Sequence, residues 1–270
     1  MAKRQKLSSC QLDELPDEVI LKIVGFLDLK ELLLCGQVSK RLQAIANDKS
    51  LWLKLNFWNR KVPYDFIEKA AGNGCQYLSL FDCGILNFKG KSEPSLNLKY
   101  LNVSNNNGGL QRVQKLVQNC SSLQKLSLAW LELDSDDFQY ICQSGQTLQV
   151  LDLDECFFDL PHLTEVTESL KGLFTNCAHL TELSISNSDM FDSHIQVLVD
   201  NLTPTILKVN LGRCVNLKNE HVKKLVKRCN NITHLDLNDT AITNDSVRSI
   251  IEQLKASLED LNVYMYSTST

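Results

Sequence analysis

The sequence has 270 residues, and 43% of them are hydrophobic. This is enough apolar material to bury a substantial core, so we expect a folded and not a disordered chain. Its 28 basic and 32 acidic residues give a formal net charge of −4 at pH 7. This balance gives no electrostatic reason to expect nucleic acid or an anionic membrane as a partner, so a partner protein or a small ligand is expected.

The N-terminus is basic, with the sequence Met1-Ala2-Lys3-Arg4-Gln5-Lys6, and residues 1–11 are expected to be a flexible tail. It lacks the apolar core of a signal peptide, and apolar runs elsewhere fall far short of the roughly 20 residues that a membrane span needs. We therefore expect the chain in the cytoplasm, the nucleus or both, without contact to a membrane.

Residues 12–55 predict three short helices. Pro16 suits the first turn of the first helix, whose apolar face is formed by Val19, Ile20, Ile23, Val24 and Leu27. Asp28 and Glu31 match a capping box for the second helix, and Ser39 can cap the third. Three such helices bury too little to be stable alone, so part of their apolar surface is expected to contact a neighbour.

From residue 75 onward one pattern recurs eight times: apolar, two others, apolar, one other, apolar, two others, then a residue such as Cys or Asn. This is the leucine-rich-repeat template. The central apolar residues recur at intervals of 23 to 32 residues and are Leu78, Leu101, Leu126, Leu151, Leu183, Val209, Leu235 and Leu261. Because strand side chains alternate, each repeat predicts a short strand with its leucines inward, and stacked strands form a parallel sheet.

Segments with apolar residues three and four apart lie between the predicted strands and indicate helices, whose starts are marked by Asp134, Asn219 and Asn244. The fold class is therefore α/β, a leucine-rich-repeat solenoid with parallel strands inside and helices outside, preceded by a small all-α module. The longest interval holds an insertion around residues 157–162, which is expected to form a loop.

The ten cysteines are spread about one per repeat, without a Cys-x-x-Cys pair, and are expected to be free thiols. Several stand near the predicted helix-to-strand return, namely Cys75, Cys120, Cys177 and Cys229. Small buried side chains explain this placement better than metal ligands do.

The N-terminal module resembles an F-box in order, spacing and residue type. The matching residues are Leu15-Pro16-Asp17-Glu18-Val19, Ile23, Leu27, Asp28, Leu32, Val38-Ser39-Lys40-Arg41-Leu42 and Ser50-Leu51-Trp52. Leu42 stands where an aromatic residue commonly follows the basic one, which weakens one packing contact. An F-box followed by leucine-rich repeats is the layout of the F-box/leucine-rich-repeat family, and the resemblance covers roughly residues 12–266.

The resemblance implies a substrate-recognition subunit of an SCF (Skp-cullin-F-box) ubiquitin ligase that is not itself an enzyme. The F-box at 12–55 would dock the Skp adaptor and through it a cullin-RING ligase, residues 56–74 would be a linker or joint, and the repeats at 75–270 would bind the substrate. By the same resemblance the adaptor contacts would come from Leu15, Pro16, Val19, Ile20, Ile23, Leu27, Leu32 and Val38.

The outward positions of the predicted strands form the concave wall and carry more acids than bases. The acids are Asp152, Asp154, Glu182, Asp236 and Asp260, against Lys125 and Lys208. This excess favours a substrate segment that is basic or donates hydrogen bonds. Three aromatic residues just past strand ends, Trp130, Phe157 and Phe158, are further candidate substrate contacts. The alternative is that these small polar positions are merely hydrated.

Catalytic and metal-binding motifs are not found in the sequence. Cys177 and His179 are the nearest nucleophile and base, but a strand approach points them apart, and His221, Cys229 and His234 fall on a helix, a turn and a strand. We expect no catalytic residue, metal or cofactor. The main alternative function is a repeat scaffold or inhibitor that binds its partner without promoting ubiquitination, and a cysteine-dependent ubiquitin-transferring enzyme is a third.

Overall fold

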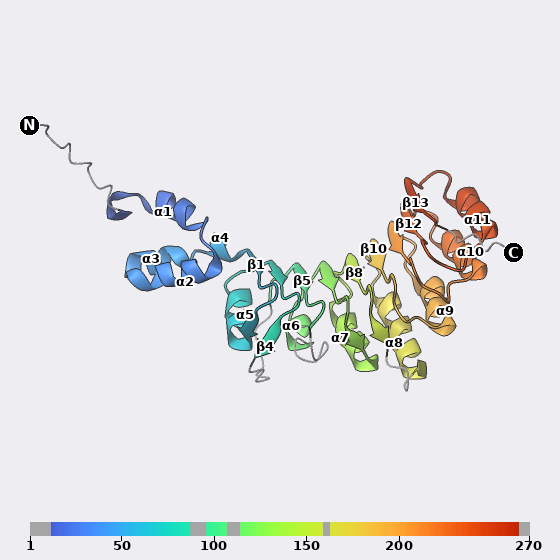
Figure 1. Cartoon of the computed structure of the whole chain (residues 1–270), viewed down its shortest axis with the longest axis horizontal. Coiled ribbons are helices and arrows are strands. Elements are labelled where there is room, and N and C mark those ends of the chain that lie inside the picture. Colours follow the sequence, from blue (N-terminus) through green and yellow to red (C-terminus); the bar gives the residue numbers. More distant parts are fainter. Residues whose placement is uncertain (1–11, 87–95, 107–113, 159–162, 265–270) are drawn as a thin grey trace, which may run out of the picture. The chain divides into compact units, whose positions relative to one another are not determined.

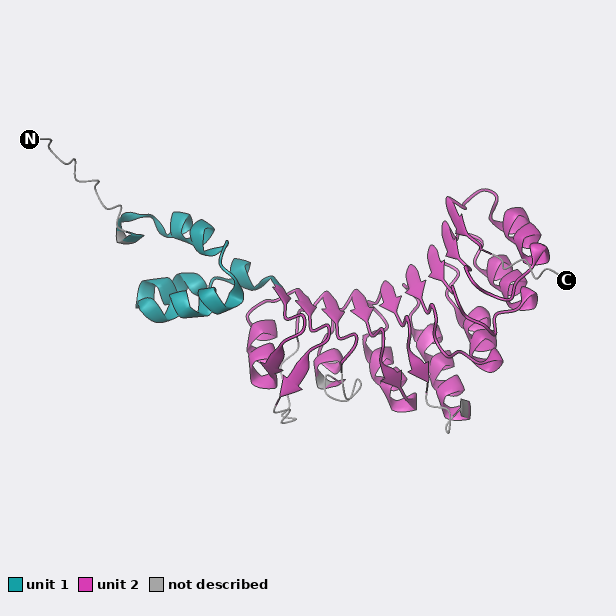
Figure 2. Ribbon diagram, viewed as in Figure 1, with its two compact units in different colours: residues 1–54 teal, residues 55–270 magenta. Residues whose placement is uncertain are grey.

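The computed structural model describes residues 12–86, 96–106, 114–158 and 163–264 (Figure 1). The chain divides into two compact units, residues 1–54 and 55–270 (Figure 2). The predicted basic tail at 1–11 lies outside the described residues. Within them, no helix combines the length and the apolar character needed to cross a bilayer.

The first unit is helical, as predicted. After the 3-10 turn Leu12–Glu14 it contains α1 (Asp17–Val24), α2 (Leu29–Val38), α3 (Lys40–Ala46) and α4 (Lys49–Trp52). The predicted capping box of α2 is confirmed, because the backbone N–H of Glu31 donates to Asp28 at 2.8 Å and that of Asp28 donates to Glu31 at 3.0 Å. Ser39 caps α3 by accepting the N–H of Leu42 at 3.2 Å.

One face of these helices makes a small core of Ile20, Val24, Leu32, Leu42, Ile45 and Ala46. Polar contacts hold the ends of the unit. Arg41 pairs with the carboxylate of Asp17 and donates to the Leu15 carbonyl, so that α3 is tied to the start of α1. The indole of Trp52 donates to the Ala46 carbonyl at 2.8 Å. The F-box-like sequence thus folds around apolar positions that are three or four residues apart within α1 and α3.

The second unit is built on a nine-stranded sheet in the order β1-β3-β5-β6-β8-β10-β11-β12-β13. The strands are β1 (Lys54–Asn56), β3 (Tyr77–Ser79), β5 (Tyr100–Asn102), β6 (Lys125–Ser127), β8 (Val150–Asp152), β10 (Glu182–Ser184), β11 (Lys208–Asn210), β12 (His234–Asp236) and β13 (Asp260–Asn262). From β3 to β13 they pair in parallel, with the predicted central apolar residues in register. The leucine-rich-repeat fold is confirmed.

Helices cover the side of the sheet opposite the exposed strand face (Figure 2). They are α5 (Tyr64–Gly72), α6 (Gln114–Gln118), α7 (Ser135–Ser144), α8 (Leu163–Asn176), α9 (Asp192–Asn201), α10 (Asn219–Arg228) and α11 (Asn244–Leu254). Two further sheets have two strands each and are separate from the nine-stranded sheet. In one, β2 (Lys61–Pro63) pairs with β4 (Gly84–Leu86), and in the other, β7 (Glu132–Leu133) pairs with β9 (Phe157–Phe158).

Three sequence expectations need correction. Residues 56–74 are not a linker, because they contain β2 and α5 and belong to the second unit. The long fourth interval is not only a loop, because Phe157 and Phe158 form β9 and the 14-residue helix α8 takes up much of the rest. Residues 159–162 lie outside the described part of the chain. Asn219 and Asn244 begin their helices instead of capping them, whereas Asp134 does cap α7.

A ladder of side-chain donors ties each repeat to the one before it. At the last position of the repeat pattern, Cys83, Asn106, Cys156, Ser188 and Cys214 are buried, and each donates to a carbonyl of the preceding repeat. Buried carbonyls need such partners because water cannot reach them. The need for a small donor explains why Cys, Asn and Ser interchange there.

The thiols serve packing. Cys75, Cys120, Cys177 and Cys229 are at most 1% exposed, as the sequence predicted, and the nine cysteines among the described residues are free.

Candidate functional site

The helical unit exposes a set of apolar side chains, here called the apolar surface. Its members are Leu12, Val19, Ile23, Phe26, Leu33, Leu34, Val38 and Leu53, with exposed fractions from 37% to 91%. Val19 and Ile23 lie four residues apart on α1, as do Leu34 and Val38 on α2, so each pair occupies one side of its helix. So many exposed apolar side chains on so small a unit favour a protein-binding surface.

The structure places the predicted adaptor contacts in two groups. Val19, Ile23 and Val38 are exposed, as is Pro16, while Leu15 and Leu27 are half-buried. Ile20 and Leu32 are 1% and 4% exposed and form the unit's own core, so the prediction that they offer contact surface is wrong. The sequence predicted one apolar face for α1. In the structure Ile20 and Val24 face the core of the unit, and Val19 and Ile23 on the adjacent side are exposed.

Phe26 was missed by the sequence reasoning although it is 91% exposed, and Leu34 was missed at 53%. A signal existed for both. Phe26 falls outside the three-and-four spacing of Ile20, Val24 and Leu27, and three successive leucines at 32–34 cannot all face one side of a helix.

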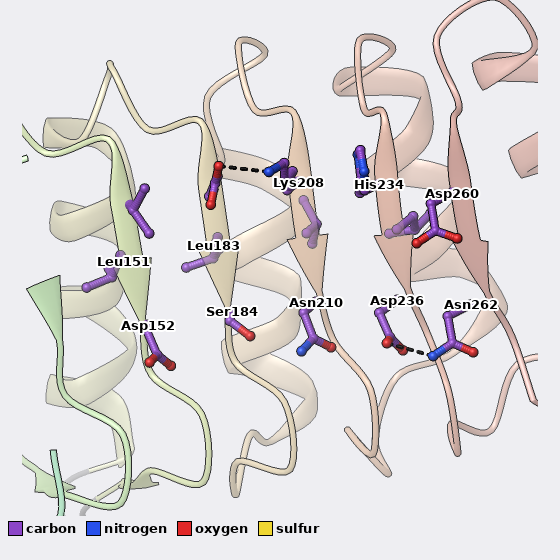
Figure 3. Close-up of a pocket in the computed structure, with 14 residues that line it drawn as sticks. Leu151, Asp152, Leu183, Ser184, Lys208, Asn210, His234, Asp236, Asp260 and Asn262 are labelled. Atoms are coloured by element: carbon purple, nitrogen blue, oxygen red, sulfur yellow. Dashed lines mark hydrogen bonds and ion pairs between the residues drawn. The ribbon is translucent and has the colours of Figure 1, made fainter. Parts of the chain in front are cut away.

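The strand face of the second unit holds a groove with a volume of about 310 Å³, here called the strand groove (Figure 3). It runs across β8, β10, β11, β12 and β13, and its polar lining comes from Asp152, Glu182, Ser184, Lys208, Asn210, His234, Asp236, Asp260 and Asn262. Four of the five predicted acids therefore meet in one place, and Asp154 lies just beyond the end of β8.

Two of these acids close turns at the ends of their strands. One carboxylate oxygen of Asp152 accepts the N–H of Asp154 at 3.1 Å, and Asp236 accepts the N–H of Asn238 at 2.9 Å. Their other oxygens accept the Ser127 hydroxyl and the Asn262 amide. Asp152 and Asp236 thus have a structural task that sequence reasoning did not foresee.

The other three predicted acids, two of which line the groove, differ in their surroundings. The Asp154 carboxylate accepts the Ser184 hydroxyl and the Ser186 N–H, both at 2.6 Å, and burial raises its pKa against the effect of these donors. Glu182 pairs with Lys208 at 3.1 Å. Asp260, on the terminal strand, is exposed. As candidate substrate contacts all five remain predictions.

The three aromatic residues predicted as substrate contacts differ in their exposure. Phe158 is 3% exposed and packs on Phe138 and His194 with ring centroids 5.8 and 5.6 Å away, so its prediction as a substrate contact is wrong. Trp130 and Phe157 are 52% and 53% exposed. Because side chains alternate along β9, only one of the two phenylalanines can enter the core.

The backbone at Trp130 is unusual for that residue. Within the described ranges, eight non-glycine residues have positive φ, one in each of eight turns that follow a strand, and five of them are Asn or Asp, which tolerate this conformation. Trp130 has φ 65°, and Glu155 and Arg213 share this conformation in their own turns, so the positive φ belongs to the repeat and not to one residue. As a substrate contact Trp130 stays a prediction.

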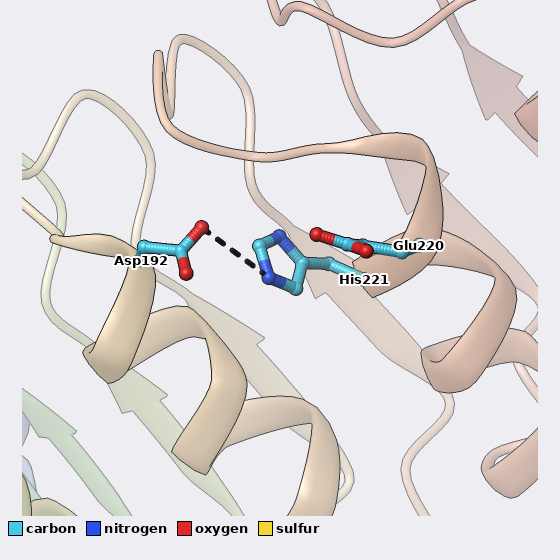
Figure 4. A group of neighbouring side chains, drawn as sticks. All are labelled: Asp192, Glu220 and His221. Atoms are coloured by element: carbon cyan, nitrogen blue, oxygen red, sulfur yellow. Dashed lines mark ion pairs between the residues drawn. The ribbon is translucent and has the colours of Figure 1, made fainter.

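One cluster has metal-ligand chemistry: Asp192, Glu220 and His221 (Figure 4). His221 is 1% exposed, and its Nδ1 accepts the Lys218 N–H at 3.2 Å, so the ring caps α10. Burial lowers the pKa of His221, although the nearby Asp192 carboxylate acts in the opposite direction. The lowered pKa favours the neutral ring. The Lys218 ammonium already occupies Asp192, so local ion pairing and capping account for the cluster.

The thiol of Cys177, the candidate nucleophile of the sequence, has a low reactivity. Burial raises the pKa of Cys177 to about 12, while His179 lies on the surface. A thiol in this state is overwhelmingly protonated at neutral pH and is a poor nucleophile.

An apolar helical surface and a polar groove on a repeat sheet define a class of partner-binding protein with two binding units. The sequence model of the F-box-like family matches residues 12–58, and that of the SKP2 LRR domain matches residues 67–266. The chain therefore belongs to the F-box/leucine-rich-repeat family, and its repeats are of the type found in SKP2, the S-phase kinase-associated F-box protein. Such proteins are typically non-catalytic adaptor-type subunits, and an F-box implies binding of a Skp-type adaptor.

Individual relatives agree with these two parts. F-box only protein 15 of Bos taurus is 45% identical over 47 residues, which are 17% of this chain and only 10% of that protein. Internalin C2 of Listeria monocytogenes superposes with a TM-score of 0.54 at 18% identity over 86% of this chain and 90% of its own. Yeast Rad7, solved in complex with Elc1, gives 0.50 at 21% identity over 63% and 43%. The two structures support the fold alone.

Proposed function

We propose that this chain is the substrate-recognition subunit of an SCF-type ubiquitin ligase and contributes no catalytic residue. The apolar surface of the F-box would bind the Skp adaptor, and through it a cullin-RING ligase, while the strand groove would bind the protein to be ubiquitinated. The observation that supports this proposal best is the apolar surface itself, on which Phe26 is the most exposed side chain at 91%, because a partner that covered these side chains would remove apolar area from water.

The buried cysteines support the non-catalytic part of the proposal. Desolvation raises the pKa of Cys120, Cys156 and Cys214 to about 12, as it does for Cys177. Transfer of ubiquitin through a cysteine needs an accessible thiolate, so these residues suit packing and not catalysis.

A pull-down from cell extract tests the proposal. The intact chain should recover the Skp adaptor and a cullin, and Phe26→Asp combined with Val38→Asp should lose both, because two charges would be buried unpaired in an apolar interface. Gln43→Asp, on the exposed side of α3, is the matched control and should recover both proteins.

Two results would separate the alternatives. If the intact chain recovers partner proteins but neither adaptor nor cullin, the scaffold or inhibitor reading replaces the proposal. If Cys→Ser substitution abolishes ubiquitin transfer by the reconstituted complex while folding is kept, the chain is an enzyme after all.

A further inference from the structure

The strand groove carries more negative charge than its own folding requires. Asp152 and Asp236 accept the N–H of the residue two positions on, and at the equivalent positions of other repeats Asn102 and Asn210 make the same bond to Ser104 and Gly212 at 2.9 and 3.0 Å. An amide oxygen therefore satisfies the turn. The charge that distinguishes aspartate from asparagine has no role in closing it.

The groove does not neutralise this charge. Among the described residues that line it, Lys208 is the one lysine or arginine, and it is already paired with Glu182 at 3.1 Å. The side chains that bond to Asp152 and Asp236 are a serine hydroxyl and an asparagine amide, both neutral. Asp152, Asp236 and Asp260 thus present uncompensated negative charge to whatever occupies the groove (Figure 3).

The spacing of the acids indicates the form of the occupant. Three inter-strand steps of about 4.8 Å separate β8 from β12, so Asp152 and Asp236 lie roughly 14 Å apart along the sheet. An extended peptide advances about 3.4 Å per residue and covers this distance in about four residues. Asp260 lies on β13, diagonally across from Asp236, and adds to the charge at that end.

Between the two charged ends the groove is nearly neutral. The Glu182–Lys208 pair, Ser184 and Asn210 occupy the middle, and Leu151, Leu183, Val209 and Leu235 lie beneath them at no more than 2% exposure. The middle therefore offers an occupant polar side chains and not the leucines. Lysine and arginine suit such a site because their long stems let the charged heads reach the carboxylates at the two ends.

We propose that the strand groove binds an extended cationic segment of the client protein, with one arginine or lysine at Asp152 and a second, about four residues along, at Asp236 and Asp260. This rests on the proposed function of the groove as the client-binding surface. Charge complementarity of this kind gives specificity and is weakened by salt.

The test uses the full chain and a fluorescein-labelled glycine/serine peptide that carries two arginines four residues apart. Fluorescence anisotropy should show binding that weakens with salt. It should fall at least about tenfold when both arginines are replaced by citrulline, the neutral isostere, or when the protein carries Asp152→Asn with Asp236→Asn. Asparagine keeps the turn bond at both positions, so circular dichroism should show the native fold.

The matched control removes two charges elsewhere. Glu168→Gln with Glu252→Gln alters exposed side chains on α8 and α11 and should bind the arginine peptide like the unmodified chain. Equal binding of the arginine and citrulline peptides, or equal loss in both double variants, would overturn the cationic site.

The outcomes for the groove and for the proposed function are independent. A chain that recovers the adaptor but does not distinguish arginine from citrulline keeps its ligase role and loses the cationic site. A chain that binds the arginine peptide through Asp152 and Asp236 but never recovers the adaptor keeps the site and loses the ligase role.

Discussion

At the scale of single residues, the third helical position of several repeats holds a buried polar side chain. Asp137, His194 and His221 are at most 3% exposed, and each accepts the backbone N–H that lies three residues before it. All three must therefore keep a lone pair available. Burial favours the neutral form of both residue types. A neutral imidazole still has a lone pair that can accept the backbone N–H, whereas an ionised carboxylate would have to be buried with its charge.

Asp137 should make stability depend on pH. Burial raises its pKa from 3.8 to about 7, so the folded state binds a proton that the unfolded state releases between these values. The free energy of unfolding should therefore fall as pH rises from about 4 to 7, at about 1.4 kcal/mol per pH unit at most. Asp137→Asn should abolish this contribution, and urea unfolding across this range measures it.

Asp245→Asn is the control, because it removes one exposed carboxylate from the first turn of a different helix, α11, away from Asp137. It should leave the pH slope of the unmodified chain in place. Parallel pH profiles for Asp137→Asn and the unmodified protein would show that the buried carboxyl does not titrate as stated.

At the scale of elements, the repeat period was readable because each strand must place its leucines inward, and Leu78 to Leu261 lie in register as predicted. The first strand, β1, was not read, although Leu55 and Phe57 repeat the apolar spacing and Asn59 has the positive φ seen after the other strands. Terminal repeats depart from the consensus because one side has no neighbour. The burial of Ile20, Leu32 and Phe158 depends on tertiary packing, which one sequence does not encode locally.

The donor ladder gives an element-scale prediction at Asn106. Its amide donates to the Leu80 carbonyl at 2.8 Å, and its oxygen accepts the Cys83 N–H at 3.0 Å. Asn106→Ala would leave both buried groups unpaired and should cost about 2 to 4 kcal/mol. Asn106→Cys should fall between, because cysteine keeps a donor there in other repeats.

Chemical denaturation with urea ranks the three proteins, and alanine at the exposed Asn231 is the control, which should change stability by less than about 0.5 kcal/mol. A loss at Asn106→Ala no larger than this control would show that the ladder does not hold the repeats together.

At the scale of the whole molecule, the proposed function assigns a different binding task to each of the two units. Among the described residues, the helical unit exposes eight large apolar side chains around a small core, whereas the repeat unit, about four times as long, exposes ten and offers polar groups on its strand face. The first arrangement suits a lasting apolar contact, and the second suits selective recognition through charge and hydrogen bonds.

The central claim is that the apolar surface binds a Skp adaptor. Titration calorimetry with purified adaptor and the full chain tests it most directly: we predict saturable binding with a Kd of about 1 µM or tighter, weakened at least about 100-fold by Phe26→Asp with Val38→Asp and unchanged by Gln43→Asp. A folded, monomeric chain that gives no binding heat at any of several temperatures, with adaptor at about 100 µM, would contradict the account.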